Sequence, residues 1–281
     1  MAKQIHWYPG HMKKAQIQIE EKLKIVDCLI ELLDARIPVS SRNNSMYEIT
    51  KSKPRLVVFT KSDLADPKET DKWIEKLSKD GNKAIFADLN NPSDIKNIIK
   101  EASKLGEAKH QKQISRGMKP QPIRAMVLGI PNVGKSTLIN KIAKRKSASV
   151  ENKPGHTKSQ QWIKVSNLFE LLDTPGVLQS RYDDELTAKN LALVGSINEN
   201  ILPLESLADS AMSFLKESYP NLLTKRFDYL NAEMDNFEAF KLIAEKRGYL
   251  LKGGLDVAKA QKVFLNEFKN GLIGRITIER V

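Results

Sequence analysis

A glycine loop set between an apolar strand and a helix is the feature that most constrains the fold of this chain. Residues 129–136 read GIPNVGKS and match the GxxxxGK(S/T) phosphate-binding pattern. The residues before them, 123–130, predict a buried strand, and residues 135–145 predict a helix. In that setting backbone N–H groups point at phosphate oxygens, and the helix N-terminus adds a positive dipole. The pattern predicts a P-loop in an α/β sheet, with a chance glycine turn as the alternative.

Two side chains of this loop carry the expected chemistry. Lys135 would supply a point charge to the β- and γ-phosphates, and the Ser136 hydroxyl would be a ligand of Mg²⁺. The neighbouring positions are also predicted to contact the nucleotide: Asn132, Val133, Gly134 and Thr137.

An acidic turn further along the chain would complete the phosphate end of the site. Residues 173–176 (DTPG) follow an apolar strand. Asp173 could hold Mg²⁺ through water, and the Gly176 N–H could reach the γ-phosphate; an ordinary strand-ending turn is the alternative. In the loop 154–157 (PGHT), the Thr157 hydroxyl is predicted to be the second protein ligand of Mg²⁺, and a solvent-exposed threonine is the alternative.

A polar turn after another predicted strand would recognise the base. Residues 60–63 (TKSD) resemble the NKxD motif with which GTPases read guanine. The Asp63 carboxylate would accept hydrogen bonds from the guanine N1–H and 2-amino groups, and the Lys61 stem would pack on the base. Thr60 stands where asparagine is usual and loses an amide, which would weaken affinity; Ser62 completes the motif. The alternative for Asp63 is a helix cap.

The next predicted strand tip and the order of the motifs extend this interpretation. Asp88 and Leu89 occupy the place of the loop whose backbone N–H meets the guanine O6. In ordinary GTPases the P-loop comes first, but here 60–63 precede 129–136. Both orders of the motifs along the chain can form the same sheet, because the strands need to be neighbours in space and not in sequence. A basic, exposed connector at 104–124 would join the two positions at which a GTPase of ordinary motif order has its termini.

The wider pattern predicts a doubly wound, mostly parallel α/β sheet followed by a smaller helical domain. Predicted strands alternate with predicted helices, which is typical of βαβ units: strands at 28–35, 55–60 and 83–88, helices at 68–79 and 94–105. Two adjacent strands are predicted at 160–166 and 168–173. Beyond them, residues 185–270 carry helical periodicity. We therefore expect a GTPase domain at 1–180 and an all-α domain at 181–281.

Longer segments narrow the family. They resemble the YlqF/RbgA family of circularly permuted ribosome-assembly GTPases, over nearly the whole chain: HWYPGHMKKA (6–15), DARIPVSSRN (34–43), GIPNVGKSTLIN (129–140), PGHTKSQQWIKV (154–165), ELLDTPGVL (170–178) and EKRGYLLKGG (245–254). The resemblance implies binding of GTP and GDP and contact with a late precursor of the large ribosomal subunit and its rRNA. It also implies GTP hydrolysis stimulated by that particle, followed by release of the factor.

The resemblance also implies an unusual catalytic arrangement. Val177 follows DTPG, where many relatives place a water-orienting glutamine, and valine cannot hydrogen-bond the nucleophile. The family assigns that role to the histidine of the PGHM segment, here His11; a surface or phosphate-contacting histidine is the alternative. His6 and His156 are weaker candidates. Asn132 matches the asparagine of potassium-activated GTPases, which implies a K⁺ ligand, with capping of the P-loop turn as the alternative.

Composition bears on partners and compartment. The formal net charge of +12 favours a polyanionic partner, and Lys and Arg clusters could neutralise rRNA phosphates: Lys13 and Lys14, 104–124, 141–146 and 259–269. We expect no DNA or membrane partner, and a monomer off the ribosome. The N-terminus lacks the apolar core of a signal peptide, and Cys28 is the single cysteine, which favours the cytoplasm.

Two function classes remain open at this point. The first is a GTPase that acts as an assembly switch on a ribosomal particle. The second is a nucleotide-gated RNA-binding module, in RNA modification or translational control, whose hydrolysis is incidental. A metabolic kinase is less consistent with the sequence, because residues 60–63 and 173–176 have no role in it.

Overall fold

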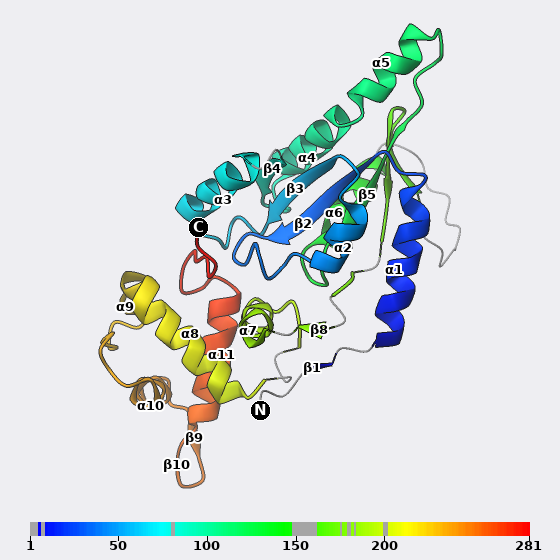
Figure 1. Ribbon diagram of the computed structural model, residues 1–281. Coiled ribbons are helices and arrows are strands. Elements are labelled where there is room, and N and C mark those ends of the chain that lie inside the picture. Colours follow the sequence, from blue (N-terminus) through cyan, green and yellow to red (C-terminus); the bar gives the residue numbers. More distant parts are fainter. Residues whose placement is uncertain are drawn as a thin grey trace.

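A six-stranded sheet forms the centre of the protein (Figure 1). The computed structural model describes residues 5–6, 9–79, 82–147, 162–174, 176–178, 181–182, 184–198 and 202–281. The strands lie in the order β4 (Lys83–Ala87), β3 (Arg55–Thr60), β2 (Cys28–Asp34), β5 (Ile123–Leu128), β7 (Phe169–Leu172) and β6 (Trp162–Ser166). All neighbours pair in parallel except β6, which runs antiparallel to β7. The predicted mostly parallel sheet is confirmed.

Burial explains why the central strands read as continuous apolar runs. Every residue of β2 and β3 is buried, because helices cover both faces of a parallel sheet. On one face, α4 (Pro92–Lys104) and α6 (Lys135–Ser147) pack on the sheet. On the other face lie α1 (Pro9–Leu23), α2 (Asn44–Thr50) and α3 (Pro67–Lys79). Since these strands are parallel, the loops after β2, β3, β4, β5 and β7 gather at one edge of the sheet.

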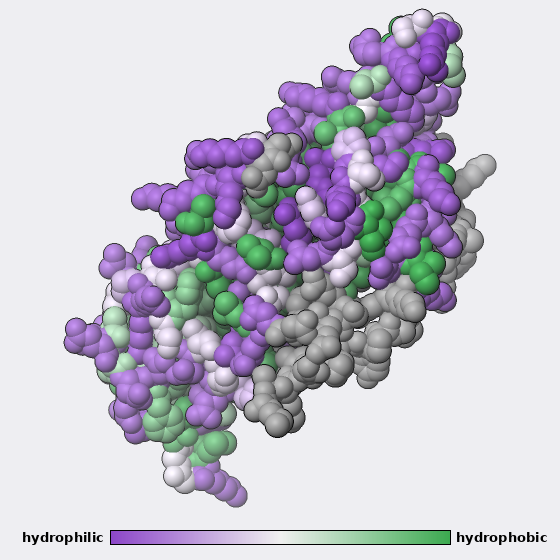
Figure 2. All heavy atoms as spheres, in the orientation of Figure 1, coloured by the Kyte–Doolittle hydropathy of each residue, from purple (hydrophilic) through white to green (hydrophobic). Residues whose placement is uncertain are grey.

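The connector between α4 and β5 is more ordered than a linker. Helix α5 (Glu107–Ser115) occupies its centre, none of its residues is buried, and it projects from the body of the protein (Figure 1). The chain then turns back, with the Gln113 side chain accepting from the Gln121 N–H at 3.0 Å. Its surface is mainly hydrophilic (Figure 2), with Ile114 and Met118 as exposed apolar residues. The expected exposure of the connector is confirmed. Its helix was not predicted, because the two prolines suggested a loop, and they lie after the helix.

The chain after the sheet is mainly helical, as expected. It contains α7 (Glu185–Leu193), α8 (Leu204–Ser218), α9 (Pro220–Arg226), α10 (Asn236–Lys246) and α11 (Val257–Lys269). Two short strand pairs interrupt the pattern: β9 (Leu250–Leu251) with β10 (Gly254–Leu255), and β1 (Ile5–His6) with β8 (Arg181–Tyr182). One apolar cluster runs from the sheet face under α4 and α6 into these helices. None of the helices in the described ranges has the length and apolarity to span a membrane.

Candidate functional site

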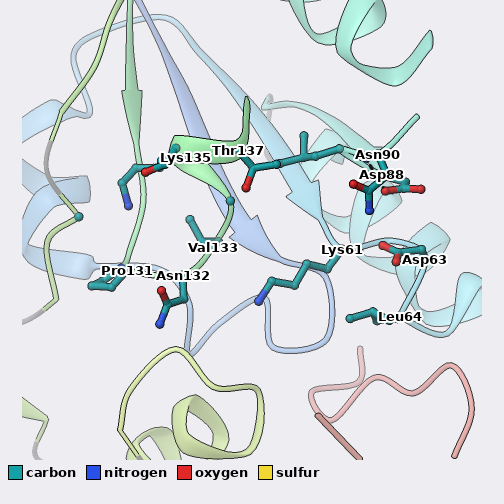
Figure 3. Close-up of a pocket in the computed structure, with 14 residues that line it drawn as sticks. Lys61, Asp63, Leu64, Asp88, Asn90, Pro131, Asn132, Val133, Lys135 and Thr137 are labelled. Atoms are coloured by element: carbon teal, nitrogen blue, oxygen red, sulfur yellow. Dashed lines mark hydrogen bonds between the residues drawn. The ribbon is translucent and has the colours of Figure 1, made fainter. Parts of the chain in front are cut away.

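A cleft of about 660 Å³ opens at the edge where the strands end (Figure 3). Its volume lies within the roughly 300–1,000 Å³ typical of ligand pockets, and its position outside the carboxyl ends of parallel strands is where α/β sheets bind ligands. The lining residues are Lys61, Asp63, Leu64, Asp88, Leu89, Asn90, Pro131, Asn132, Val133, Gly134, Lys135, Ser136, Thr137 and Gly176. Figure 3 shows Pro131, Asn132 and Lys135 at one end, and Asp63, Asp88 and Asn90 at the other.

The P-loop takes a conformation that its glycines allow. Gly134 has φ +110, a backbone conformation that would be strained in a residue with a side chain. A Cβ at this position would also lie only 2.7 Å from Leu89 Cδ1. Asn132 adopts φ +57, a left-handed conformation that asparagine tolerates better than most residues. Ser136 and Thr137 follow at the start of α6 and are exposed to the cleft. The predicted strand–loop–helix arrangement is present.

Lys135 is a nearly buried cation at the phosphate end of the cleft. Its side chain turns back on its own loop, where the Nζ donates to the carbonyl oxygens of Gly129 (2.9 Å) and Ile130 (2.6 Å). Burial lowers the pKa of Lys135 to about 8, against the opposing effect of the Asp173 charge. An anion at this end of the cleft would therefore favour the charged form of Lys135.

The DTPG turn meets the P-loop at Lys135. A Cβ at Gly176 would lie 2.8 Å from the Lys135 Nζ and 3.0 Å from the Pro131 backbone nitrogen, so a side chain there would crowd the lysine and the P-loop. Burial raises the pKa of Asp173, although the Lys135 charge opposes the shift. The Thr174 hydroxyl donates to the carbonyl oxygen of Val127, which ties the turn to the P-loop strand. Lys135 and Asp173 therefore belong to one site.

Lys61 is held at the base end by an ion pair behind it. Lys61 adopts φ +56, and its Nζ lies 3.0 Å from Asp34 Oδ2 at the end of β2. Asp34 also receives the Arg36 guanidinium, at 3.0 Å from Nε and 2.9 Å from Nη2. Burial alone would raise the pKa of Asp34, but the charges of Arg36 and Lys61 hold it well below its ordinary value. This charge arrangement fixes the Lys61 stem across the cleft.

The remaining residues of the base loop, which we define as residues 60–66, divide between the cleft and its support. Asp63 and Leu64 line the cleft. Thr60 and Ser62 do not: Thr60 is fully buried, and its hydroxyl lies 2.6 Å from the Val133 carbonyl oxygen. Contact of Thr60 and Ser62 with a nucleotide therefore stays a prediction, and their observed roles are structural.

The loop after β4 closes the base end. Asp88 and Leu89 line the cleft as predicted, and the Asp88 N–H donates to Asp94 at 2.8 Å. Lys141, which we had assigned to a basic surface cluster, instead donates to the Leu89 carbonyl oxygen (2.7 Å) and to Asn90 Oδ1 (2.8 Å). The motifs did not single out three lining residues, Leu64, Asn90 and Pro131, although each directly follows or lies inside a predicted motif.

The candidate histidines His11 and His6 belong to two different elements near the N-terminus. His11 lies in α1, and His6 lies in β1, which pairs with β8 just beyond the DTPG turn. Val177 is buried in the apolar cluster with Ile19, so its side chain does not reach the cleft. Thr157 and His156 lie outside the described residues.

Asn132 contacts the helical region. Its Nδ2 donates to the Gly195 carbonyl oxygen at 3.0 Å, in the turn after α7. Its Oδ1 is the atom that could serve as a cation ligand. Among the residues with described side chains, no group of three or more His, Cys, Asp or Glu is arranged to hold a metal.

Comparison with known proteins agrees with this geometry. The family model described as "50S ribosome-binding GTPase" matches residues 124–225. The chain is 43% identical to ribosome biogenesis GTPase A of Bacillus cereus, covering 98% of this chain and 93% of that protein. It is 33% identical to the Thermotoga maritima protein of the same name, covering 98% and 94%. The crystal structure of GNP-bound YlqF from T. maritima has a TM-score of 0.66 at 29% identity, covering 95% of this chain and 98% of that one.

Proposed function

The chain belongs to the YlqF/RbgA family of ribosome biogenesis GTPases and hydrolyses GTP, and from that premise we propose that it is a late assembly factor of the large ribosomal subunit. In this proposal it contacts rRNA of the precursor, hydrolyses GTP in response to the particle, and then leaves. The observation that carries the proposal is one cleft shared by a P-loop and a base loop, in a chain related over 98% of its length to ribosome biogenesis GTPases.

At the base end, Asp63 would read guanine. Its carboxylate lines the cleft, and a carboxylate accepts from both the N1–H and the 2-amino group of guanine. Lys61, fixed by Asp34, would cover one face of the base. The backbone of Asp88 and Leu89 would meet the guanine O6.

At the phosphate end, Lys135 would neutralise the β- and γ-phosphates, and Gly176 would donate its N–H to the γ-phosphate. Ser136, Asp173 and Thr157 would hold Mg²⁺, which supplies charge neutralisation during phosphoryl transfer. Hydroxyl and carboxylate oxygens are the hard ligands that Mg²⁺ prefers. Asn132 Oδ1 would be a ligand of K⁺.

His11 would orient the attacking water. Its support is the burial of Val177, which leaves no side chain at that position to do so. The pairing of β1 with β8 brings the chain that precedes α1 to the chain that follows the DTPG turn. An ordered N-terminal segment would explain slow intrinsic turnover and faster turnover on a particle with a single mechanism.

The partner surface would include the projecting α5 and the proposed helical domain at 181–281. Both carry lysines, and a net charge of +12 favours RNA. We propose a monomer off the ribosome, acting in the cytoplasm, with no DNA or membrane partner.

A GTPase assay with and without purified large subunits tests the proposal. We expect stimulation of about tenfold or more by large-subunit particles, and much less by small subunits or by free rRNA at equal nucleotide concentration. Equal stimulation by free rRNA would favour the alternative, a nucleotide-gated RNA-binding module. No stimulation by any of these would contradict both.

A further inference from the structure

The C-terminal tail, residues 271–281, lies against the base loop. Arg275 reaches two carbonyl oxygens of that loop, with Nη2 2.7 Å from Ser62 O and Nε 2.8 Å from Ala65 O. These carbonyls flank Asp63 on both sides. Because the guanidinium is a rigid, planar fork, the two bonds together fix the spacing between the ends of the turn that carries Asp63.

Two further contacts follow along the tail. The Ile276 N–H donates to the Leu64 carbonyl oxygen at 3.0 Å, and the Thr277 hydroxyl oxygen accepts from the Asp66 N–H at 3.1 Å. Consecutive tail residues therefore contact consecutive parts of the base loop. Figure 3 shows the C-terminal segment, in red, passing below Leu64.

The two ends of the base loop are tied to the sheet at Thr60 and to α3 at Asp66, but within the described residues its middle, 61–65, has few other backbone hydrogen bonds. Its own turn is closed by the Leu64 N–H donating to the Lys61 carbonyl oxygen at 2.9 Å. The bond from the Ser62 N–H to the Ala87 carbonyl oxygen is long, at 3.5 Å. The carbonyls of Ser62, Leu64 and Ala65 all receive tail donors, so the tail supplies much of the restraint on Asp63.

The tail is itself firmly anchored beyond the base loop. The Ile278 N–H donates to the Arg36 carbonyl oxygen at 2.8 Å. The Glu279 carboxylate accepts from the backbone N–H groups of Val39 (2.6 Å) and Ser40 (3.0 Å). Its carbonyl oxygen accepts from the Trp73 indole at 2.8 Å. The restraint on the base loop is therefore transmitted from a fixed segment.

We propose that Arg275 is a positioning residue that sets guanine specificity by holding Asp63 in place. The inference rests on the proposed assignment of Asp63 to guanine. Arg275 is not among the residues that line the cleft; it fixes the backbone on either side of Asp63, which is. Removing it lets Asp63 move away from the N1–H and 2-amino groups while the phosphate end is unchanged.

Inosine diphosphate provides the measurement, because it lacks the 2-amino group but keeps N1–H and both phosphates. Calorimetry of GDP and inosine diphosphate binding gives their affinity ratio for wild type, Arg275→Ala and Arg280→Ala. Arg280 is the matched control: it is also an exposed tail arginine, but it bonds the Ser218 carbonyl oxygen, not the carbonyls beside Asp63, and stacks on Tyr219. Tyr219 reaches the base loop only at its far end, through the Asp66 side chain. In Arg275→Ala we expect the preference for GDP to fall by at least about threefold, with no change in Arg280→Ala.

Asp63→Asn in the same assay tests the assignment of Asp63 to guanine separately from the positioning role of Arg275. If Asp63→Asn keeps the guanine preference, the assignment of the base site fails and the role of Arg275 with it. If Asp63→Asn loses the preference but Arg275→Ala keeps it, only the positioning role is overturned. If Arg275→Ala weakens the binding of GDP and of inosine diphosphate equally, the positioning role is also overturned. Should Arg275→Ala unfold, Arg275→Lys, which can reach only one carbonyl, must show the reduced ratio in its place.

Discussion

The Thr60 hydroxyl donates to the Val133 carbonyl oxygen at 2.6 Å, which joins the strand carrying the base loop to the P-loop. In Thr60→Val the shape is kept, but that buried carbonyl loses its donor. We expect the free energy of unfolding to fall by about 1–3 kcal/mol, measured by denaturant titration. Thr70→Val is the control, because its acceptor, the Asp66 carbonyl oxygen, keeps a backbone bond from the Thr70 N–H. Equal losses in both variants would contradict this role of Thr60.

Replacing the carboxylate of Asp63 should change which base the site prefers. Asp63→Asn replaces an acceptor with an amide that can donate to the 2-carbonyl of xanthine. We expect the variant to lose affinity for GTP and gain affinity for xanthosine triphosphate. Competition binding with the two nucleotides measures this directly. Unchanged GTP binding in the variant would rule out the assignment of Asp63.

Removal of the P-loop cation should weaken binding without harming the fold. In Lys135→Ala the phosphates lose a charge-assisted contact of about 1.5–3 kcal/mol, so GTP affinity should fall roughly ten- to hundredfold. The variant removes a charge whose burial is unfavourable, but it also removes the donor to the Gly129 and Ile130 carbonyl oxygens. Because these two effects oppose each other, we expect only a small change in melting temperature. Calorimetry and a thermal melt give the two values. Normal GTP binding would count against the P-loop interpretation.

The lowered pKa of Lys135 predicts a pH dependence of nucleotide binding. Burial places the pKa at about 8 in the empty cleft, and bound phosphates favour the ammonium and raise it. Between these two values binding takes up a proton, so GDP affinity should fall as the pH rises above about 8, by at most about tenfold per pH unit.

The control for this dependence is Lys135→Ala, in which only the titration of the nucleotide itself remains. The affinity ratio of wild type to variant should therefore decrease between about pH 7 and about pH 9. A ratio independent of pH would mean that Lys135 is not the titrating group.

His11 should matter for hydrolysis on the particle and not for binding. In His11→Ala we expect GTP and particle binding to remain, while the stimulated rate falls about 10²–10⁴-fold, the usual cost of losing a positioned catalytic group. Single-turnover hydrolysis on saturating large subunits measures this, with His6→Ala as the neighbouring control. A wild-type rate would exclude the catalytic role, and loss of particle binding would make His11 a docking residue.

Local patterns predicted much of this structure, and long-range contacts did not. The strand 55–60 and the helix starting at 135 were located to the residue, because apolar runs and a phosphate-loop motif are signals within a few positions of the chain. The weaker nucleotide binding expected from Thr60 stays a prediction. Its hydrogen bond to Val133, 73 residues away, was not predicted. Nothing in the residues around Arg275 indicates that it meets Ser62, since that contact depends on how the helical region docks.

The length of chain between Ser62 and Arg275 has a consequence for biosynthesis. Arg275 lies 213 residues after Ser62, which at about 5–20 residues per second is roughly 10–40 s of translation. The sheet strands, all made by residue 172, are complete long before the tail exists. A nascent chain that ends before residue 275 therefore contains every strand of the sheet but not the tail donors to its base loop. The order of synthesis alone therefore withholds the restraint on Asp63 until residue 275 has been added.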